Sequence, residues 1–142
     1  MNKKILLFLL LPLFILSCEE EDYSQETKIL SDYLLLTFRE KIAQEPHYYF
    51  IISSTSCLPC VKEYMKILDE QDAQSILSKV TIITTIPVLA NHEYKNKFHL
   101  LFDQNGELNY LNLYLCNLTV FKTEKGAIQD IARFNVDKKS NY

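Results

Sequence analysis

The sequence has no tryptophan and only two glycines among its 142 residues. Phosphate-cradling loops and dinucleotide-binding fingerprints need several closely spaced glycines, so both are excluded. The 15 basic residues do not outnumber the 18 acidic ones, and no basic patch for nucleic acid is expected. Four cysteines are too few for a disulfide scaffold. The remaining possibility is a single globular domain, long enough to bury a core without cross-links.

The only long hydrophobic run, residues 5–16, follows Lys3 and Lys4 at the start of the chain. It is shorter than the roughly 20 residues that span a bilayer, and it fits the apolar region of a secretory signal. The run ends in "ILSC", residues 15–18, which resembles the lipobox of bacterial lipoproteins. The resemblance implies removal of residues 1–17 and acylation of Cys18, which anchors the protein to a membrane. The alternative is an ordinary signal peptide with a chance cysteine.

Four consecutive acidic residues, Glu19 to Asp22, follow this cysteine. Like charges repel and stay solvated, which predicts a tether over residues 18–24 that holds the domain off the membrane. An acidic run in this place also resembles the export signal of surface-displayed lipoproteins in some Gram-negative phyla. The expected location is therefore the cell envelope, at the outer membrane, on its periplasmic face or at the cell surface. Without Lys3 and Lys4 the net charge is −5, which favours a soluble monomer.

Hydrophobic periodicity beyond the tether predicts alternating helices and strands, in a domain over residues 25–136 with a frayed tail over 137–142. Alternation of this kind predicts an α/β fold, with a central mixed sheet, helices on both faces and a C-terminal antiparallel hairpin. The predicted helices are 24–44, 58–71, 73–78, 90–97 and 107–115. The predicted strands are 47–53, 80–86, 98–103, 118–123 and 127–134.

The stretch "STSCLPC", residues 54–60, joins a predicted buried strand to a predicted amphipathic helix. Cys57 falls at the first turn of that helix, where the macrodipole and free backbone N–H groups favour a thiolate. Cys60 lies one turn further along and is within reach of Cys57, while Pro59 stiffens the helix start. This arrangement suits a dithiol redox centre.

The segment "STSCLPCVKEYMKIL" resembles the active-site segment of thioredoxin-fold proteins. Residues 97–131 share the layout of the membrane-anchored thioredoxin-like and alkyl hydroperoxide reductase type branch, with Asp103, Gly106 and Gly126 in matching places. The resemblance covers roughly residues 46–134. It implies a thioredoxin-like fold and an enzyme that exchanges disulfides with extracytoplasmic proteins, with Cys57 as nucleophile, Cys60 as resolving thiol and no cofactor.

The sequence departs from that family at two places. Ser56 stands where an aromatic residue usually precedes the first cysteine, and neither Asn117 nor Leu118 is the usual cis-proline. Cys116 directly precedes the position of the cis-proline. In the thioredoxin fold, the loop that carries this proline faces the cysteine pair. Cys116 is then a small buried residue, a second resolving thiol or a third soft ligand.

Two other functions are considered, a binding module and a peroxidase. The departures motivate the first, a non-catalytic thioredoxin-fold module that binds a partner or a soft metal through Cys57, Cys60 and Cys116. Copper, zinc and an iron–sulfur cluster are the candidate metals, with His92 or His99 as further ligands for copper. Zinc is disfavoured because the other half of a zinc site is missing, and a peroxidase is disfavoured because no peroxidatic motif surrounds Cys57.

Overall fold

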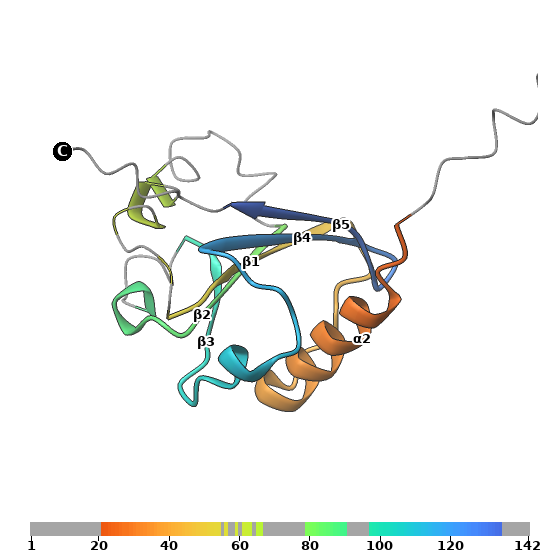
Figure 1. The fold of residues 1–142 in the computed structure, drawn as a ribbon, viewed down its shortest axis with the longest axis horizontal. Helices are drawn as coiled ribbons and strands as arrows, with labels where there is room; N and C mark the ends of the chain where they lie inside the picture. The colour runs from red at the N-terminus through yellow and green to blue at the C-terminus, as the bar shows by residue number, and fades with distance from the viewer. Residues whose placement is uncertain are drawn as a thin grey trace, which may run out of the picture.

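The centre of the molecule is a five-stranded mixed sheet with the strand order β3-β2-β1-β4-β5. The computed structural model describes residues 21–54, 56, 59, 61–63, 65–66, 79–90 and 97–134. The expected mixed sheet is confirmed, with an antiparallel hairpin at one edge (Figure 1). The strands are β1 His47–Ile52, β2 Val80–Thr84, β3 His99–Phe102, β4 Leu118–Glu124 and β5 Ala127–Phe134. The helical elements are α2 Ser24–Tyr33, the π-helix η2 Leu34–Phe38, and the 3-10 helices η3 Pro87–Ala90 and η4 Glu107–Tyr110.

Strand β1 lies in the middle of the sheet and is paired on both sides. It runs parallel to β2, with Phe50 opposite Ile82, and antiparallel to β4, with Phe50 opposite Val120. Strand β3 extends the parallel half and β5 the antiparallel half. Its two faces are covered as well, because Tyr49 and Ile51 lie in one hydrophobic cluster while Tyr48, Phe50 and Ile52 lie in or against another. Burial on both faces explains the continuous apolar sequence "YYFII".

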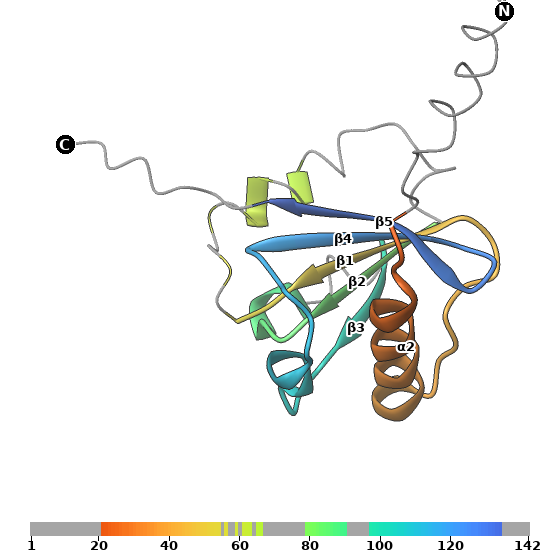
Figure 2. The ribbon, with the colours of Figure 1, turned by 45° about the vertical axis from the view of Figure 1, so that its right-hand side comes forward.

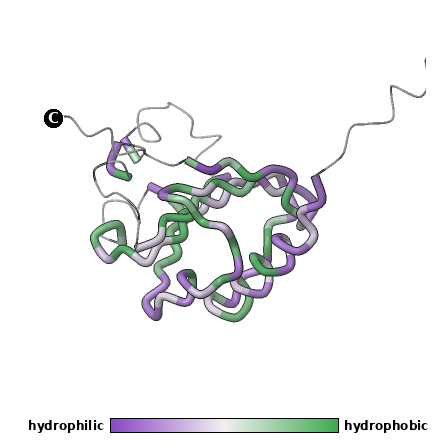
Figure 3. The backbone as a smooth tube through the Cα atoms, viewed as in Figure 1, coloured by the Kyte–Doolittle hydropathy of each residue, from purple (hydrophilic) through white to green (hydrophobic). Residues whose placement is uncertain are grey.

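Two hydrophobic clusters lie among the buried residues, and helical residues contribute to each. In the first, α2 and η2 place Leu30, Tyr33 and Leu34 against Ile51 and Phe121. Figures 1 and 2 show α2 packed along one side of the sheet. Figure 3 shows hydrophobic stretches in the strands and hydrophilic ones at the start of α2.

The second cluster contains two residues of the helical segment that follows the cysteine pair. Val61 and Met65, 1% and 2% exposed, join Ile52, Ile82 and Leu118. Burying an apolar side chain of this size contributes about 1.5–3 kcal/mol, so the contact holds the described part of this segment on the sheet.

The first helix ends earlier than the sequence predicted. We expected helix over residues 24–44, but α2 continues only through η2, and Arg39 adopts a left-handed conformation with φ 62°. The Glu40 N–H then donates to the Leu34 carbonyl, a bond that closes the C-terminus of a helix. The following residues have other partners: the Ala43 and Gln44 carbonyls accept the N–H groups of the turn between β4 and β5.

The predicted helix over residues 107–115 is also wrong. Only η4 is helical; Leu111 after it has an extended backbone, and residues 111–113 form bends. Leu111, Leu113 and Leu115 pack against the first cluster while Asn112 and Tyr114 are exposed, a period of two. The helix was predicted from Leu108, Leu111 and Leu115, whose spacings of three and four fit a helix, but the tertiary contacts select a non-helical backbone.

The predicted strand 127–134 has the bounds of β5, and the other remaining elements differ at their boundaries or fall partly outside the described residues. Strand β2 ends at Thr84, and η3 takes up the residues up to Ala90. The predicted helix 73–78, the signal peptide, the tail and most of helices 58–71 and 90–97 lie outside the described residues. Within the described part of the chain, no helix has the length and hydrophobicity needed to cross a membrane.

Replacement of Gly126 by alanine is expected to destabilise the fold. Lys125 and Gly126 both have positive φ, 55° and 76°, as a two-residue hairpin turn requires. A Cβ at Gly126 would also lie 2.7 Å from the Gln44 Nε2 atom. We expect a loss of about 1–2 kcal/mol in the free energy of unfolding, measured by urea titration.

The matched control is Gly126→Asn, because asparagine tolerates the left-handed conformation better than alanine. It should lose clearly less than the alanine variant. Equal losses would mean that the contact with Gln44, rather than backbone conformation, sets the cost.

Candidate functional site

The loop that enters the cysteine pair contacts the loop that contains Cys116. After β1, the Ser56 N–H donates to the Ser53 carbonyl at 3.0 Å, which closes a turn. The Ser56 hydroxyl then donates to the Asn117 carbonyl at 2.5 Å, and the Ser56 side chain is buried. Ser56 directly precedes Cys57, and Asn117 directly follows Cys116. The structure therefore brings together Ser56 and Asn117 of the predicted site.

Cys57 and Cys60 lie outside the described residues, as does Cys18. Pro59, between the pair, is helical and exposed, so the described helix of this segment begins there. Leu118 is buried in the second cluster.

Cys116 is a free, buried cysteine. It lies just before β4, which runs antiparallel to β1, and is therefore close to the carboxyl-terminal end of β1. Its N–H donates to the Thr119 hydroxyl at 2.9 Å, and Thr119 is fully buried opposite Ile51 of β1. This hydrogen bond fixes the backbone of Cys116 to the start of β4.

A buried carboxylate organises the neighbouring loop after β3. Asp103 accepts the Gly106 N–H at 2.9 Å, the Leu108 N–H at 2.7 Å and the Tyr33 hydroxyl at 3.0 Å. These bonds satisfy N–H groups at the start of η4 and connect that loop to α2. Burial, together with the negative charge of Asp103, raises the pKa of Tyr33, which therefore stays protonated as the donor. The roles of Asp103 seen here are structural.

The loop after β3 also reaches the loop before the cysteine pair. The Ser54 hydroxyl donates to Asn109 Oδ1 of η4 at 3.2 Å. Asn109 could not be identified from the sequence, because a polar residue on a predicted helix surface carries no information about which loop it contacts.

Neither described histidine lies with the described site residues. His47 Nε2 is 2.8 Å from the Thr81 hydroxyl, and burial, aided by the positive charge of His99, lowers the pKa of His47. His99 Nε2 lies 2.9 Å from Glu40 Oε1. His92 lies outside the described residues. Among the residues that the structure describes, no three His, Cys, Asp or Glu side chains are placed to hold a metal.

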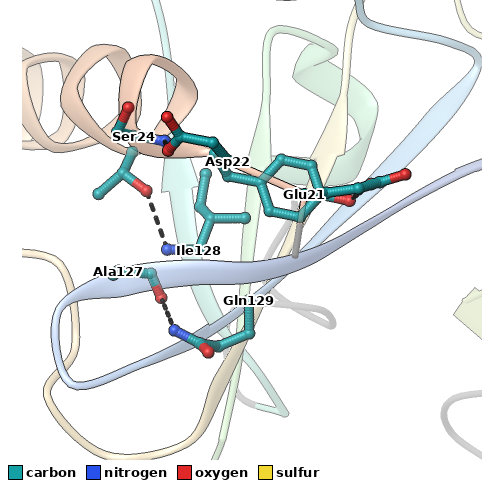
Figure 4. A pocket seen from close by; sticks show the side chains of 8 residues that line it. Glu21, Asp22, Ser24, Ala127, Ile128 and Gln129 are labelled. Atoms are coloured by element: carbon teal, nitrogen blue, oxygen red, sulfur yellow. Dashed lines mark hydrogen bonds between the residues drawn. The ribbon is translucent and has the colours of Figure 1, made fainter. Parts of the chain in front are cut away.

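A surface hollow lies at the end of the sheet away from the cysteine segment. It has a volume of about 790 Å³ and lies between the start of α2 and the start of β5 (Figure 4). Glu21 and Asp22 line it, and the Asp22 carboxylate accepts the Ser24 N–H at 3.0 Å. The last residue of the acidic run thus holds the first turn of α2.

One buried hydroxyl near the site has no hydrogen-bond partner. Thr85 Oγ1 is the only such side-chain atom in the described part of the chain. The Thr85 N–H lies 3.4 Å from the Ile52 carbonyl at the end of β1, which places Thr85 beside the start of the cysteine loop. A buried hydroxyl without a hydrogen-bond partner cannot be identified from the sequence, because its possible partners come from every element that packs around it.

Comparisons with known proteins identify no relative. No family model matches the chain, and neither the curated proteins nor the solved structures include a significant match.

Ser56→Ala is expected to loosen the contact between the two loops. It removes the donor to the Asn117 carbonyl, which should lower the free energy of unfolding by about 1 kcal/mol. It should also change the rate at which iodoacetamide alkylates the thiols, followed by mass spectrometry. The comparison variant is Ser54→Ala, which removes an exposed hydrogen bond to Asn109 of a different loop and should therefore cost less. Wild-type stability and alkylation in Ser56→Ala would contradict a role for this bond.

Thr85→Val is expected to stabilise the protein, because it removes a buried hydroxyl that makes no hydrogen bond. The expected gain is up to about 1 kcal/mol in urea unfolding. The matched control is Thr84→Val at the neighbouring residue, the last of β2. The Thr84 hydroxyl accepts the Ile86 N–H at 3.0 Å, so its removal should destabilise the protein. If both variants are destabilised alike, the Thr85 hydroxyl has a partner in solution.

Proposed function

We propose that this protein is a lipid-anchored, thioredoxin-like thiol–disulfide oxidoreductase that exchanges disulfides with extracytoplasmic proteins. The observation that carries the proposal is the hydrogen bond from Ser56 to Asn117. In a thioredoxin-like site, the loop before the first cysteine and the loop before the penultimate strand meet beside the dithiol. Ser56 and Asn117 occupy those two sequence positions, and they are in contact.

The topology of the sheet supports the same proposal. The strand before the cysteines is central, with a parallel neighbour on one side and an antiparallel hairpin on the other. Chemistry in α/β sheets collects beyond the carboxyl ends of the parallel strands, and the cysteine segment follows β1 there. The thioredoxin-like fold, with helices on both faces, is part of this proposal. Helical residues occur in both hydrophobic clusters.

The proposed chemistry needs no cofactor. The Cys57 thiolate attacks one sulfur of a partner disulfide. The partner S–S bond breaks, a Cys57–partner disulfide forms, and the released partner thiolate takes a proton. The Cys60 thiolate then attacks the Cys57 sulfur and releases the second partner thiol. Two electrons pass from the dithiol to the partner, and an external dithiol reductant restores the Cys57–Cys60 pair. The same steps in reverse oxidise a partner dithiol.

The packing of the following segment supports the role of Cys57. Val61 and Met65 are fixed in the second cluster, which holds this helical segment against the sheet. A cysteine at the start of such a segment lies near unpaired backbone N–H groups, which favour its thiolate. The anchor at Cys18 and the location in the cell envelope belong to the proposal on the strength of the lipobox and the acidic run.

The alternative is a non-catalytic thioredoxin-like module that binds a partner or a soft metal. One observation favours it: Cys116 is buried and free, and its neighbour Asn117 contacts the loop of Cys57. A third thiol near the pair would complete a soft metal site. Metal content and thiol number after anaerobic purification discriminate between the two functions.

Cys57→Ser should abolish disulfide exchange, because serine provides no thiolate to attack the partner. Cys60→Ser should accumulate mixed disulfides with the partner, because the resolving thiol is gone. Both are read by alkylation and mass spectrometry after equilibration with glutathione buffers. The native pair should titrate as one two-thiol step between roughly −300 and −120 mV.

Cys116→Ser is the control and should leave this step unchanged. Full exchange activity in Cys57→Ser would refute the proposed mechanism. Masking of all three thiols by a bound ion would favour the metal-binding module instead.

A further inference from the structure

The chain enters the domain at one end of the sheet. The Ile128 N–H donates to the Thr27 hydroxyl at 3.0 Å, so the first turns of α2 lie beside the start of β5. Glu21 and Asp22 share the hollow with Ala127 and other residues of that strand (Figure 4). Glu21 and Asp22, the described residues of the acidic run, therefore lie at the end of the domain with the β4–β5 turn.

The proposed site lies at the opposite end. Within the hairpin, Ile128 pairs with Thr123, whereas Phe134 pairs with Leu118, next to Asn117. The six residue steps of β5 between these pairs correspond to about 20 Å at 3.4 Å per residue. Figures 1 and 2 show the same arrangement: the start of α2 and the yellow-green helical residues between 59 and 66 lie at opposite ends of the sheet.

The linker between the proposed lipid and the domain is shorter than this separation. Only Glu19 and Glu20 stand between Cys18 and Glu21. Three fully extended residue steps reach about 10 Å at most. An acyl group on Cys18 therefore keeps the hollow near the lipid headgroups, while the far end of the sheet has no comparable restraint.

We propose that the anchored domain stands with its hollow toward the bilayer and its cysteine end toward the aqueous phase. This inference rests on the proposed function, and it deepens that function by naming the class of partner. The partner is a water-soluble protein that approaches from the aqueous side. A disulfide held at the headgroups of the same membrane lies about 20 Å below the cysteine end.

Lipid photocrosslinking of the full-length acylated protein in phosphatidylcholine vesicles tests the orientation. A benzoylphenylalanine is introduced at Lys125, in the β4–β5 turn, or at Ser54, beside the cysteine loop. Both positions are exposed. We expect lipid adducts to form at Lys125 with at least about fivefold higher yield, because of the separation along the sheet. Equal yields, or a higher yield at Ser54, would overturn the orientation.

The partner class is tested with a water-soluble peptide that contains one disulfide, and with the same peptide joined directly to a phospholipid headgroup in the same vesicles. The soluble peptide should be reduced at least about tenfold faster, since the joined peptide cannot cover the separation. In detergent micelles the two rates should become equal. Faster reduction of the joined peptide in vesicles would overturn the inference.

Two readouts separate failure of this inference from failure of the proposed function. If the intact mass shows no acyl group on Cys18, the protein has no lipid anchor and the proposed orientation is refuted. Absence of exchange with either peptide in detergent would refute the oxidoreductase. Exchange by an acylated protein with the wrong crosslinking pattern would refute the orientation alone.

Discussion

The structure depends on the double pairing of β1. Its backbone is hydrogen-bonded to β2 in parallel and to β4 in antiparallel register, so neither edge is open to water. Buried backbone groups must be paired, and a central strand pairs all of them with its two neighbours. This constraint fixes where β1 ends, at Ile52, and therefore where the cysteine segment begins. It also brings the start of β4, with Cys116 and Asn117 just before it, to that same end.

A network of short-range polar contacts then joins the loops at this end. Asp103 holds the loop after β3 through two backbone N–H groups and connects it to Tyr33 of α2. Ser54 reaches Asn109 in that loop, and Ser56 reaches Asn117 in the next. Three loops, which follow β1 and β3 or precede β4, are thus tied to each other. Such ties position a site more precisely than flexible loops would, because each contact restricts the backbone of its neighbour.

Some of these features could be predicted from the sequence, and others could not. The strands were located to within two residues at each end, because apolar β-branched and aromatic runs bounded by polar residues give a strong signal. The helical predictions failed at 107–115, where leucines satisfy both a helical period and a period of two. They also failed after Phe38, because the backbone of residues 43 and 44 serves as hydrogen-bond acceptor for a hairpin turn more than 80 residues away.

The sequence by itself determined the composition of the core, the positions of the strands and the presence of a cysteine pair after a buried strand. These are local properties, set by the hydrophobicity and conformational preference of neighbouring residues. Only the tertiary structure decided that Ser56 contacts Asn117 and that the Thr85 hydroxyl has no hydrogen-bond partner among the described residues. It also decided that Glu21 and Asp22 lie at the opposite end of the sheet from the Ser56–Asn117 contact. Each of these depends on which strands pair, and pairing between distant segments is chosen by the combined burial and hydrogen bonding of the whole sheet.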